Sequence, residues 1–174
     1  SAPAKVVPPD PENDPVLIAG GFLEGHPDLK FRRMGLEEFN RGKADKAFKL
    51  FQRAALYADK PSQALVAEML WGGIGVEQDR GLAMVWMDLA AERGYEAFVG
   101  KRDAYWRKLD DAERKRALAE GAAIRAEYED KVAEPRLARV LRRERGRMTG
   151  SRLGSSTSPL QIIVPGYGSI DGAR

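Results

Sequence analysis

The chain has 174 residues, of which 43% are hydrophobic and 32% charged, and it contains one histidine and no cysteine. This composition suits one globular domain with a tail, and it excludes disulfide bonds, thiolate metal sites and a histidine-based zinc site. No apolar run approaches the roughly 20 residues that a membrane-spanning helix needs. Because runs of β-branched residues are scarce before residue 160, the sequence predicts an all-α protein.

The net charge of +3 is unevenly distributed along the chain. From Arg136 onward, eight arginines stand against Glu144 and Asp171, which gives this part +6 and leaves −3 for residues 1–135. The basic charge is therefore a local property of the C-terminal part.

Residues 1–26 are expected to form a proline-rich leader and a short capping segment. Five of the first 15 residues are prolines, which fix φ and remove backbone donors, and the apolar run 16–23 predicts a short helix. The small residues at the very start are typical of a mature exported chain, so we expect a periplasmic or secreted protein. A cytoplasmic location is also compatible with the sequence.

Residues 27–131 show helical periodicity and are expected to form one solenoid of paired helices. Helices are expected at about 27–39, 44–58, 63–71, 80–93, 95–109 and 110–131. Their ends carry recognisable signals: Ser62 and Asp79 as N-caps, Gly94 as a C-terminal glycine, and Asp110 with Glu113 as a capping box.

Residues 132–174 are expected to hold a basic helix and an extended tail. Pro135 is expected to end the preceding helix, and 136–147 to form the basic helix. A Gly- and Ser-rich linker follows, and 160–164 is the one convincing strand signal. Because one strand is not stable alone, this segment must pair with another part or chain, and we expect the native chain to continue past Arg174.

The chain resembles itself when it is shifted by 36 residues. This shift aligns Ala47 with Ala83, Phe51 with Met87, Ala54 with Ala90 and Ala55 with Ala91. Alanines at these positions let helices approach closely, and the interval lies in the range of helix-turn-helix repeats.

One copy of this repeat is complete, at residues 64–97. Its repeat-defining residues are Gly73, Gly75, Asp79, Ala83, Trp86, Ala90, Ala91 and Gly94. With them the chain resembles the Sel1-like repeat family, relatives of the tetratricopeptide repeat, over roughly residues 28–131. The first copy has a shorter loop and the third lacks the glycine-rich turn, so the third is expected to act as a cap. The resemblance implies a short right-handed α-solenoid in an exported bacterial protein, with a role as an adaptor and with no catalytic residues or cofactor.

We therefore expect a protein–protein interaction scaffold in the bacterial cell envelope, and no enzyme. The concave side, formed by the first helix of each pair, is the expected contact surface for a protein or peptide partner. The candidate partner-binding residues are Glu68, Trp71, Arg102, Tyr105, Trp106, Arg139, Arg142 and Arg143, since interface anchors are often Trp, Tyr and Arg.

The basic C-terminal part leaves two alternatives open. It could bind an acidic protein, an anionic membrane surface or nucleic acid, of which nucleic acid is the least expected partner. It could instead dock Leu137, Val140 and Leu141 on the acidic solenoid while its arginines pair with that solenoid.

Overall fold

A computed structural model describes residues 22–150 of the chain. Within this range the regular structure is entirely helical, as predicted. The elements are η1 (Phe22–Gly25), α2 (Pro27–Asn40), α3 (Ala44–Ala55), α4 (Lys60–Gly72), α5 (Arg80–Ala90), η2 (Ala91–Arg93), α6 (Glu96–Lys108), α7 (Asp111–Tyr128) and α8 (Asp130–Gly150). The predicted leader, the linker and the strand at 160–164 lie outside the described residues.

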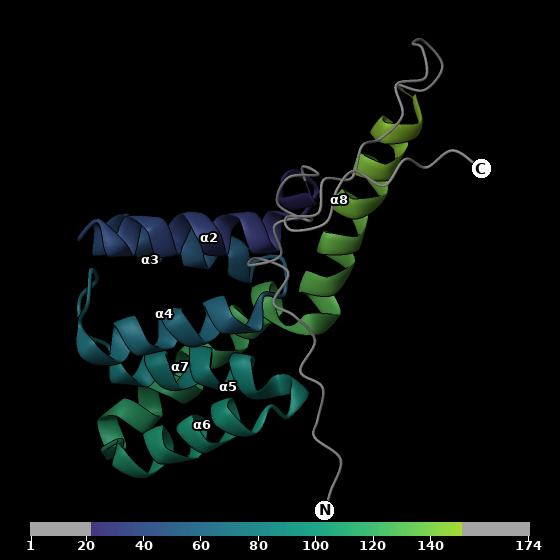
Figure 1. Cartoon of the computed structure of the whole chain (residues 1–174). Coiled ribbons are helices and arrows are strands. Elements are labelled where there is room, and N and C mark those ends of the chain that lie inside the picture. The colour runs from purple at the N-terminus through teal and green to yellow at the C-terminus, as the bar shows by residue number, and fades with distance from the viewer. Residues whose placement is uncertain (1–21, 151–174) are drawn as a thin grey trace, which may run out of the picture.

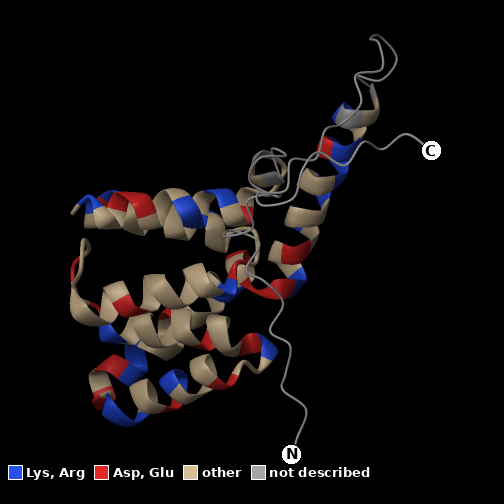
Figure 2. Cartoon of the chain, in the orientation of Figure 1, with Lys and Arg blue, Asp and Glu red and all other residues tan. Residues whose placement is uncertain are grey.

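The helices form three consecutive pairs followed by α8. The pairs are α2 with α3, α4 with α5, and α6 with α7. Figure 1 shows the first helices of the pairs, α2, α4 and α6, one below another, and α8 on the right-hand side of the molecule. Within the stack α3 packs on α4, and α5 packs on both α6 and α7. This arrangement is a short right-handed α-solenoid, in which each pair buries its apolar face against its neighbour. Figure 2 shows charged residues of both signs spread over the helix pairs. Basic residues also lie along the length of α8.

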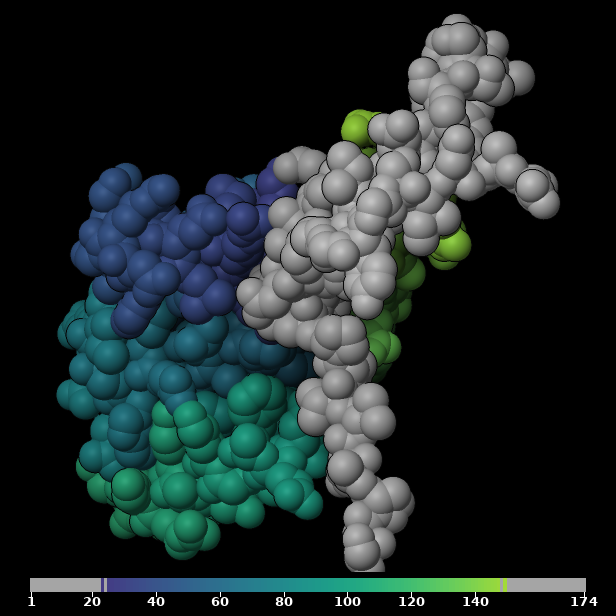
Figure 3. Space-filling model, in the orientation of Figure 1, coloured from purple at the N-terminus to yellow at the C-terminus, as the bar shows by residue number. Residues whose placement is uncertain are grey.

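The core lies where the first two pairs meet. Phe51 of α3 and Met87 of α5, which the internal repeat aligns, are both fully buried. The aligned residues Ala47 and Ala83 are also fully buried, and their small side chains let the helices approach closely. Trp86 is buried beside them, as its repeat position predicts. Figure 3 shows that side chains fill the gap between the ribbons of α2 and α4.

Most predicted helix ends are confirmed. Asp79 is the N-cap of α5 and accepts a hydrogen bond from the backbone N–H of Leu82 at 2.9 Å. Asp110 and Glu113 form the predicted capping box, in which each side chain accepts from the other residue's backbone N–H. Gly94 follows η2 with a φ of +79°, the left-handed conformation expected after a helix.

The predicted N-cap of α4 is wrong. Asp59, rather than Ser62, caps this helix, and its carboxylate accepts from the backbone N–H of Ser62 at 3.1 Å. The helix begins at Lys60, and Pro61 lies in its first turn, where a missing backbone donor costs nothing.

The predicted break at Pro135 is also wrong, because this proline lies inside α8. The chain turns instead at Glu129, whose backbone is extended with a ψ of 154°. The backbone N–H of Asp130 then donates to Glu92 at 3.0 Å from Oε2, so a distant side chain caps α8. Pro135 lies in the second turn of α8, and the start of the helix is fixed before it, by the Glu92 cap and by the complete burial of Ala133.

Candidate protein-interaction surface

Two cross-helix pairs join α4 to α6. The carboxylate of Glu68 forms an ion pair with the ammonium group of Lys101. One turn further along, the ring of Trp71 stacks on that of Tyr105, with centroids 4.0 Å apart and planes 13° from parallel. Residues three and four apart share one face of a helix, so the two pairs form a continuous line across the first helices of two repeats.

An arginine that the sequence interpretation did not single out holds the aromatic pair in place. The guanidinium group of Arg80 lies 4.2 Å from the ring centroid of Trp71. The same group donates to the backbone carbonyl of Lys108 and lies 3.1 Å from a carboxylate oxygen of Glu113. Trp71 and Tyr105 are consequently half-buried, and burial raises the pKa of Tyr105.

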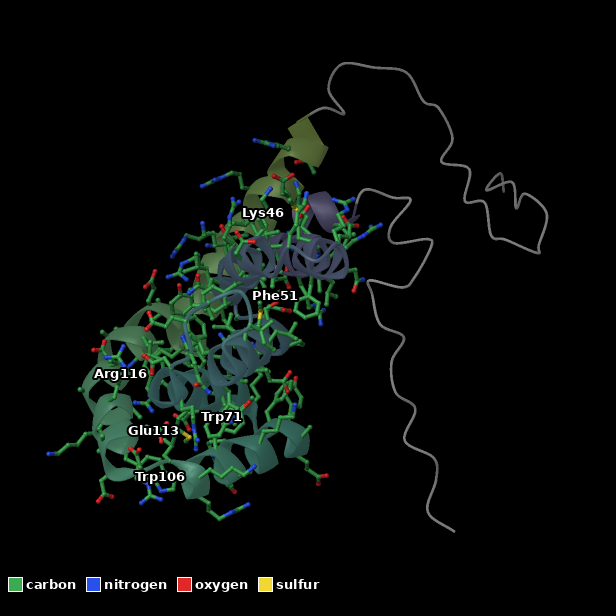
Figure 4. All side chains as sticks on the ribbon, turned by 90° about the vertical axis from the view of Figure 1, so that its left-hand side faces the viewer. Lys46, Phe51, Trp71, Trp106, Glu113 and Arg116 are labelled. Atoms are coloured by element: carbon green, nitrogen blue, oxygen red, sulfur yellow. The ribbon has the colours of Figure 1, made fainter. Side chains whose placement is uncertain are left out.

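Trp106 flanks this line near the end of α6, about 100° around the helix from Tyr105. Its side chain is 38% exposed, and the guanidinium group of Arg114 lies 5.1 Å from its ring centroid. Figure 4 shows Trp106, Trp71 and Glu113 close together at one end of the molecule. We refer to Glu68, Trp71, Lys101, Tyr105 and Trp106 as the α4–α6 row.

The other candidate residues lie outside this row. Arg102 turns toward α5, where its guanidinium group lies 3.8 Å from Asp88, and it also contacts Asp103 at 3.1 Å. Arg139, Arg142 and Arg143 lie on α8 and are exposed. The structure thus separates the candidates into the row, one arginine beside α5, and a group on α8.

A buried polar cluster, centred on Lys60, was missed by the sequence interpretation. The side chain of Lys60 is 1% exposed, and its Nζ donates to the backbone carbonyl of Leu89 at 2.9 Å and to Gln63 at 3.1 Å. The same nitrogen lies 2.8 Å from Glu92 Oε2 and 2.9 Å from Asp130 Oδ1. Lys60 therefore ties the second pair to the start of α8. A lysine within the small and apolar residues that open α4 is the one local signal of such a site.

Arg93 completes this cluster from the other side. Its guanidinium group donates to both carboxylate oxygens of Asp130, at 2.8 and 3.0 Å, and to the backbone carbonyl of Ala58 at 3.1 Å. Burial raises the pKa of Asp130, but the hydrogen bonds and charges of Arg93 and Lys60 outweigh burial and hold the pKa below its ordinary value.

Comparison with known protein families identifies the repeat that builds this helical array. The sequence pattern of the Sel1 repeat matches residues 35–56 and 60–95. The chain carries Sel1-like repeats at these residues. The longer match covers the repeat predicted as complete, and the shorter one covers the copy with the shortened loop. Sel1 repeats are generally modules for protein–protein interaction and are typically not enzymatic.

A solved structure supports the same fold. A crystal structure of a protective antigen present in uropathogenic Escherichia coli strains, which displays an SLR fold, matches this chain with a TM-score of 0.54 at 18% sequence identity. The match covers 82% of this chain and 28% of that chain, so this Sel1-like protein spans less than a third of its neighbour's length. At this identity the likeness shows the fold alone. No curated protein sequence matches the chain.

A cavity of about 460 Å³ opens beside the Lys60 cluster. Its lining includes the carboxylates of Asp28 and Asp59 and the rings of Tyr95 and Phe98. Both carboxylates belong to helix starts, and burial raises the pKa of each. Among residues 22–150 no cluster of His, Asp or Glu has a metal-binding arrangement, and no helix is long and apolar enough to cross a membrane.

The pKa shifts of Asp130 and Asp59 have opposite signs and predict opposite pH dependences. Asp130 has a lowered pKa, so its stabilising effect is present above the ordinary value of 3.8 and is lost as the pH falls through the folded-state pKa. The cost of Asp130→Asn is therefore expected to be largest near about pH 7 and to shrink toward about pH 3.

Asp59 has a raised pKa because of its burial, so its ionisation destabilises the fold as the pH rises through the folded-state pKa. Relative to the native chain, Asp59→Asn should gain stability as the pH rises over the same range. Urea unfolding of both variants across this range measures the two trends. Differences that do not change with pH would contradict both assignments.

Proposed function

We propose that this Sel1-like protein is a scaffold that binds a protein or peptide partner through the α4–α6 row. The observation that carries the proposal is the fixed, partly exposed pairing of Trp71 with Tyr105 and of Glu68 with Lys101 across two first helices. Trp and Tyr are the commonest anchors of protein interfaces, and aromatic side chains that are already held in place lose little entropy on binding.

The chemistry of the row favours a partner segment with both apolar and charged side chains. Trp106 offers an exposed ring, and Lys101 and Glu68 offer opposite charges, with side chains 49% and 40% exposed. An exposed ion pair of this kind contributes at most about 1 kcal/mol to folding, so its groups can exchange partners at little cost.

We place this activity in the bacterial cell envelope. The solved neighbour, a protective antigen present in uropathogenic Escherichia coli strains, is a bacterial protein with the same fold. Fractionation of native cells tests the location, and recovery of the protein with cytoplasmic markers would contradict it.

The binding face is tested with a partner captured from the native host, purified and then titrated with variants. Trp106→Ala is expected to weaken binding at least about tenfold, the effect of losing an interface anchor, and to lower the free energy of unfolding by about 1–2 kcal/mol, since more than half of the side chain is covered. Leu118→Ala is the matched control, because it also removes a large apolar side chain, which is 73% exposed on the second helix of a pair. Equal weakening by both variants, or none by Trp106→Ala, would remove the row as the binding face.

A further inference from the structure

The exposed arginines of α8 are not neutralised by the body of the protein. Residues 136–150 contain six arginines and one acid, Glu144, for a net charge of +5, whereas residues 22–135 contain 20 basic and 21 acidic residues and carry −1. Of these arginines, Arg136 is docked, because it donates to the backbone carbonyl of Glu127 at 3.1 Å and to that of Leu56.

Helix geometry separates an inner from an outer side of α8. At 100° per residue, Leu137, Val140, Leu141 and Glu144 share the inner side, where all four are partly buried. The inner side faces η1, since a Cβ added at Gly25 would lie 3.7 Å from Glu144.

Arg139, Arg142 and Arg143 lie on the opposite, outer side and are exposed. We call these three residues the arginine face. Over residues 22–150 no ion pair joins any of them to a carboxylate. Glu144, the one acid among residues 136–150, contacts Arg147 instead, at 3.4 Å. Figure 1 shows α8 at the edge of the described part of the chain, with the three helix pairs all on one side of it. The sequence analysis left open that the arginines of this helix pair with the solenoid. Arg136 does contact it, whereas, within the described residues, the three residues of the arginine face do not.

We infer that the arginine face docks the protein on an anionic phospholipid surface. A planar layer of phosphate groups can approach the outer side of α8 without meeting the helix pairs, and guanidinium groups bind phosphate through two parallel hydrogen bonds. The attraction of a charged bilayer decays within about one Debye length, so basic residues confined to a single helix suffice.

The same surface fits other partners less well. A protein interface is built around apolar or aromatic anchors, and the arginine face contains none. A nucleic-acid backbone is usually followed by a wider basic surface, whereas residues 22–135 carry −1. Leu137, Val140 and Leu141 face inward, so the helix binds at the phosphate level and does not insert into the acyl chains.

Vesicle sedimentation of the full chain tests this inference, with phosphatidylglycerol–phosphatidylcholine vesicles and pure phosphatidylcholine vesicles as the neutral reference. The chain should bind only the anionic vesicles, and more weakly as salt is added. The triple variant Arg139→Gln, Arg142→Gln, Arg143→Gln should bind about 100-fold more weakly, since each arginine near an anionic surface contributes about 1 kcal/mol.

The matched control removes three exposed lysines of α3 and α7, with Lys46→Gln, Lys49→Gln and Lys115→Gln, and therefore has the same net charge. It should bind anionic vesicles as the native chain does, and Trp106→Ala should too, because the α4–α6 row is a separate surface. Equal loss in the control, equal binding to neutral vesicles, or tighter binding to duplex DNA at the same salt concentration would overturn the inference.

Discussion

Replacing Gly75 with alanine is expected to lower the free energy of unfolding by about 3 kcal/mol. Gly75 has a φ of +70°, and this left-handed conformation costs a residue with a Cβ about 1–2 kcal/mol. The added Cβ would also lie 2.4 Å from the carbonyl carbon of Ala44, at the start of α3. Backbone atoms cannot rotate away as a side chain can, so overpacking adds about 1–3 kcal/mol.

Gly94→Ala separates the two causes. Gly94 also has a positive φ, +79°, but an added Cβ would meet no atom within 4 Å. This variant should therefore lose only the conformational part, about 1 kcal/mol. Urea unfolding measures both losses. Equal losses would mean that the close approach of the glycine-rich turn to α3 contributes nothing to stability.

Gly75 also shows what the sequence could and could not predict. Its place in a glycine-rich turn was evident from the repeat, because turn chemistry depends on a few neighbouring residues. Its contact with Ala44 was not, since that contact depends on how one repeat stacks on another. The helix ends at Asp79, Gly94 and the Asp110 capping box were predicted for the same reason as the turn, because their signals are local.

The errors at Ser62 and Pro135 have different origins. The cap of α4 is local, since Asp59 accepts from the backbone N–H of Ser62 three residues further on, and the wrong one of two neighbouring capping residues was chosen. At Pro135 a local rule predicted a break, but the carboxylate of Glu92 fixes the start of α8 upstream of the proline. Local propensity is a weak prior wherever burial or a distant side chain supplies the missing partner.

The sequence predicted several residues of the candidate site but not how their side chains pack against one another. Repeat positions and residue type nominated Trp71 and Tyr105, but their stacking depends on the register between α4 and α6, which the intervening α5 and its loops set. Arg102 was nominated together with them but lies outside the row, because its guanidinium group turns toward Asp88 of α5.

Lys60→Met is expected to cause the second large loss of stability, about 3 kcal/mol or more. The substitution keeps the apolar stem of a side chain that is 1% exposed but leaves Glu92 and Asp130 without the ammonium group that lies within 3 Å of both. Removing one partner of a buried ion pair typically costs about 3–5 kcal/mol, and the lower value applies here because Asp130 keeps Arg93 and the side chain of Glu92 is partly exposed. Lys101→Met removes an exposed ion pair instead and should cost less than about 1 kcal/mol.

A second substitution distinguishes lost charge from lost packing. In the double variant Lys60→Met, Glu92→Gln, one uncompensated carboxylate is gone, while the amide oxygen can still accept from the backbone N–H of Asp130. Recovery of stability relative to Lys60→Met would assign the loss to charge, whereas additive losses would assign it to packing. Because the cluster also fixes the start of α8, hydrogen exchange at the amide of Ala133 should accelerate in Lys60→Met and not in Lys101→Met. Unchanged exchange would mean that α8 is held by its apolar contacts alone, and that the Lys60 cluster stabilises the second repeat without positioning the arginine face.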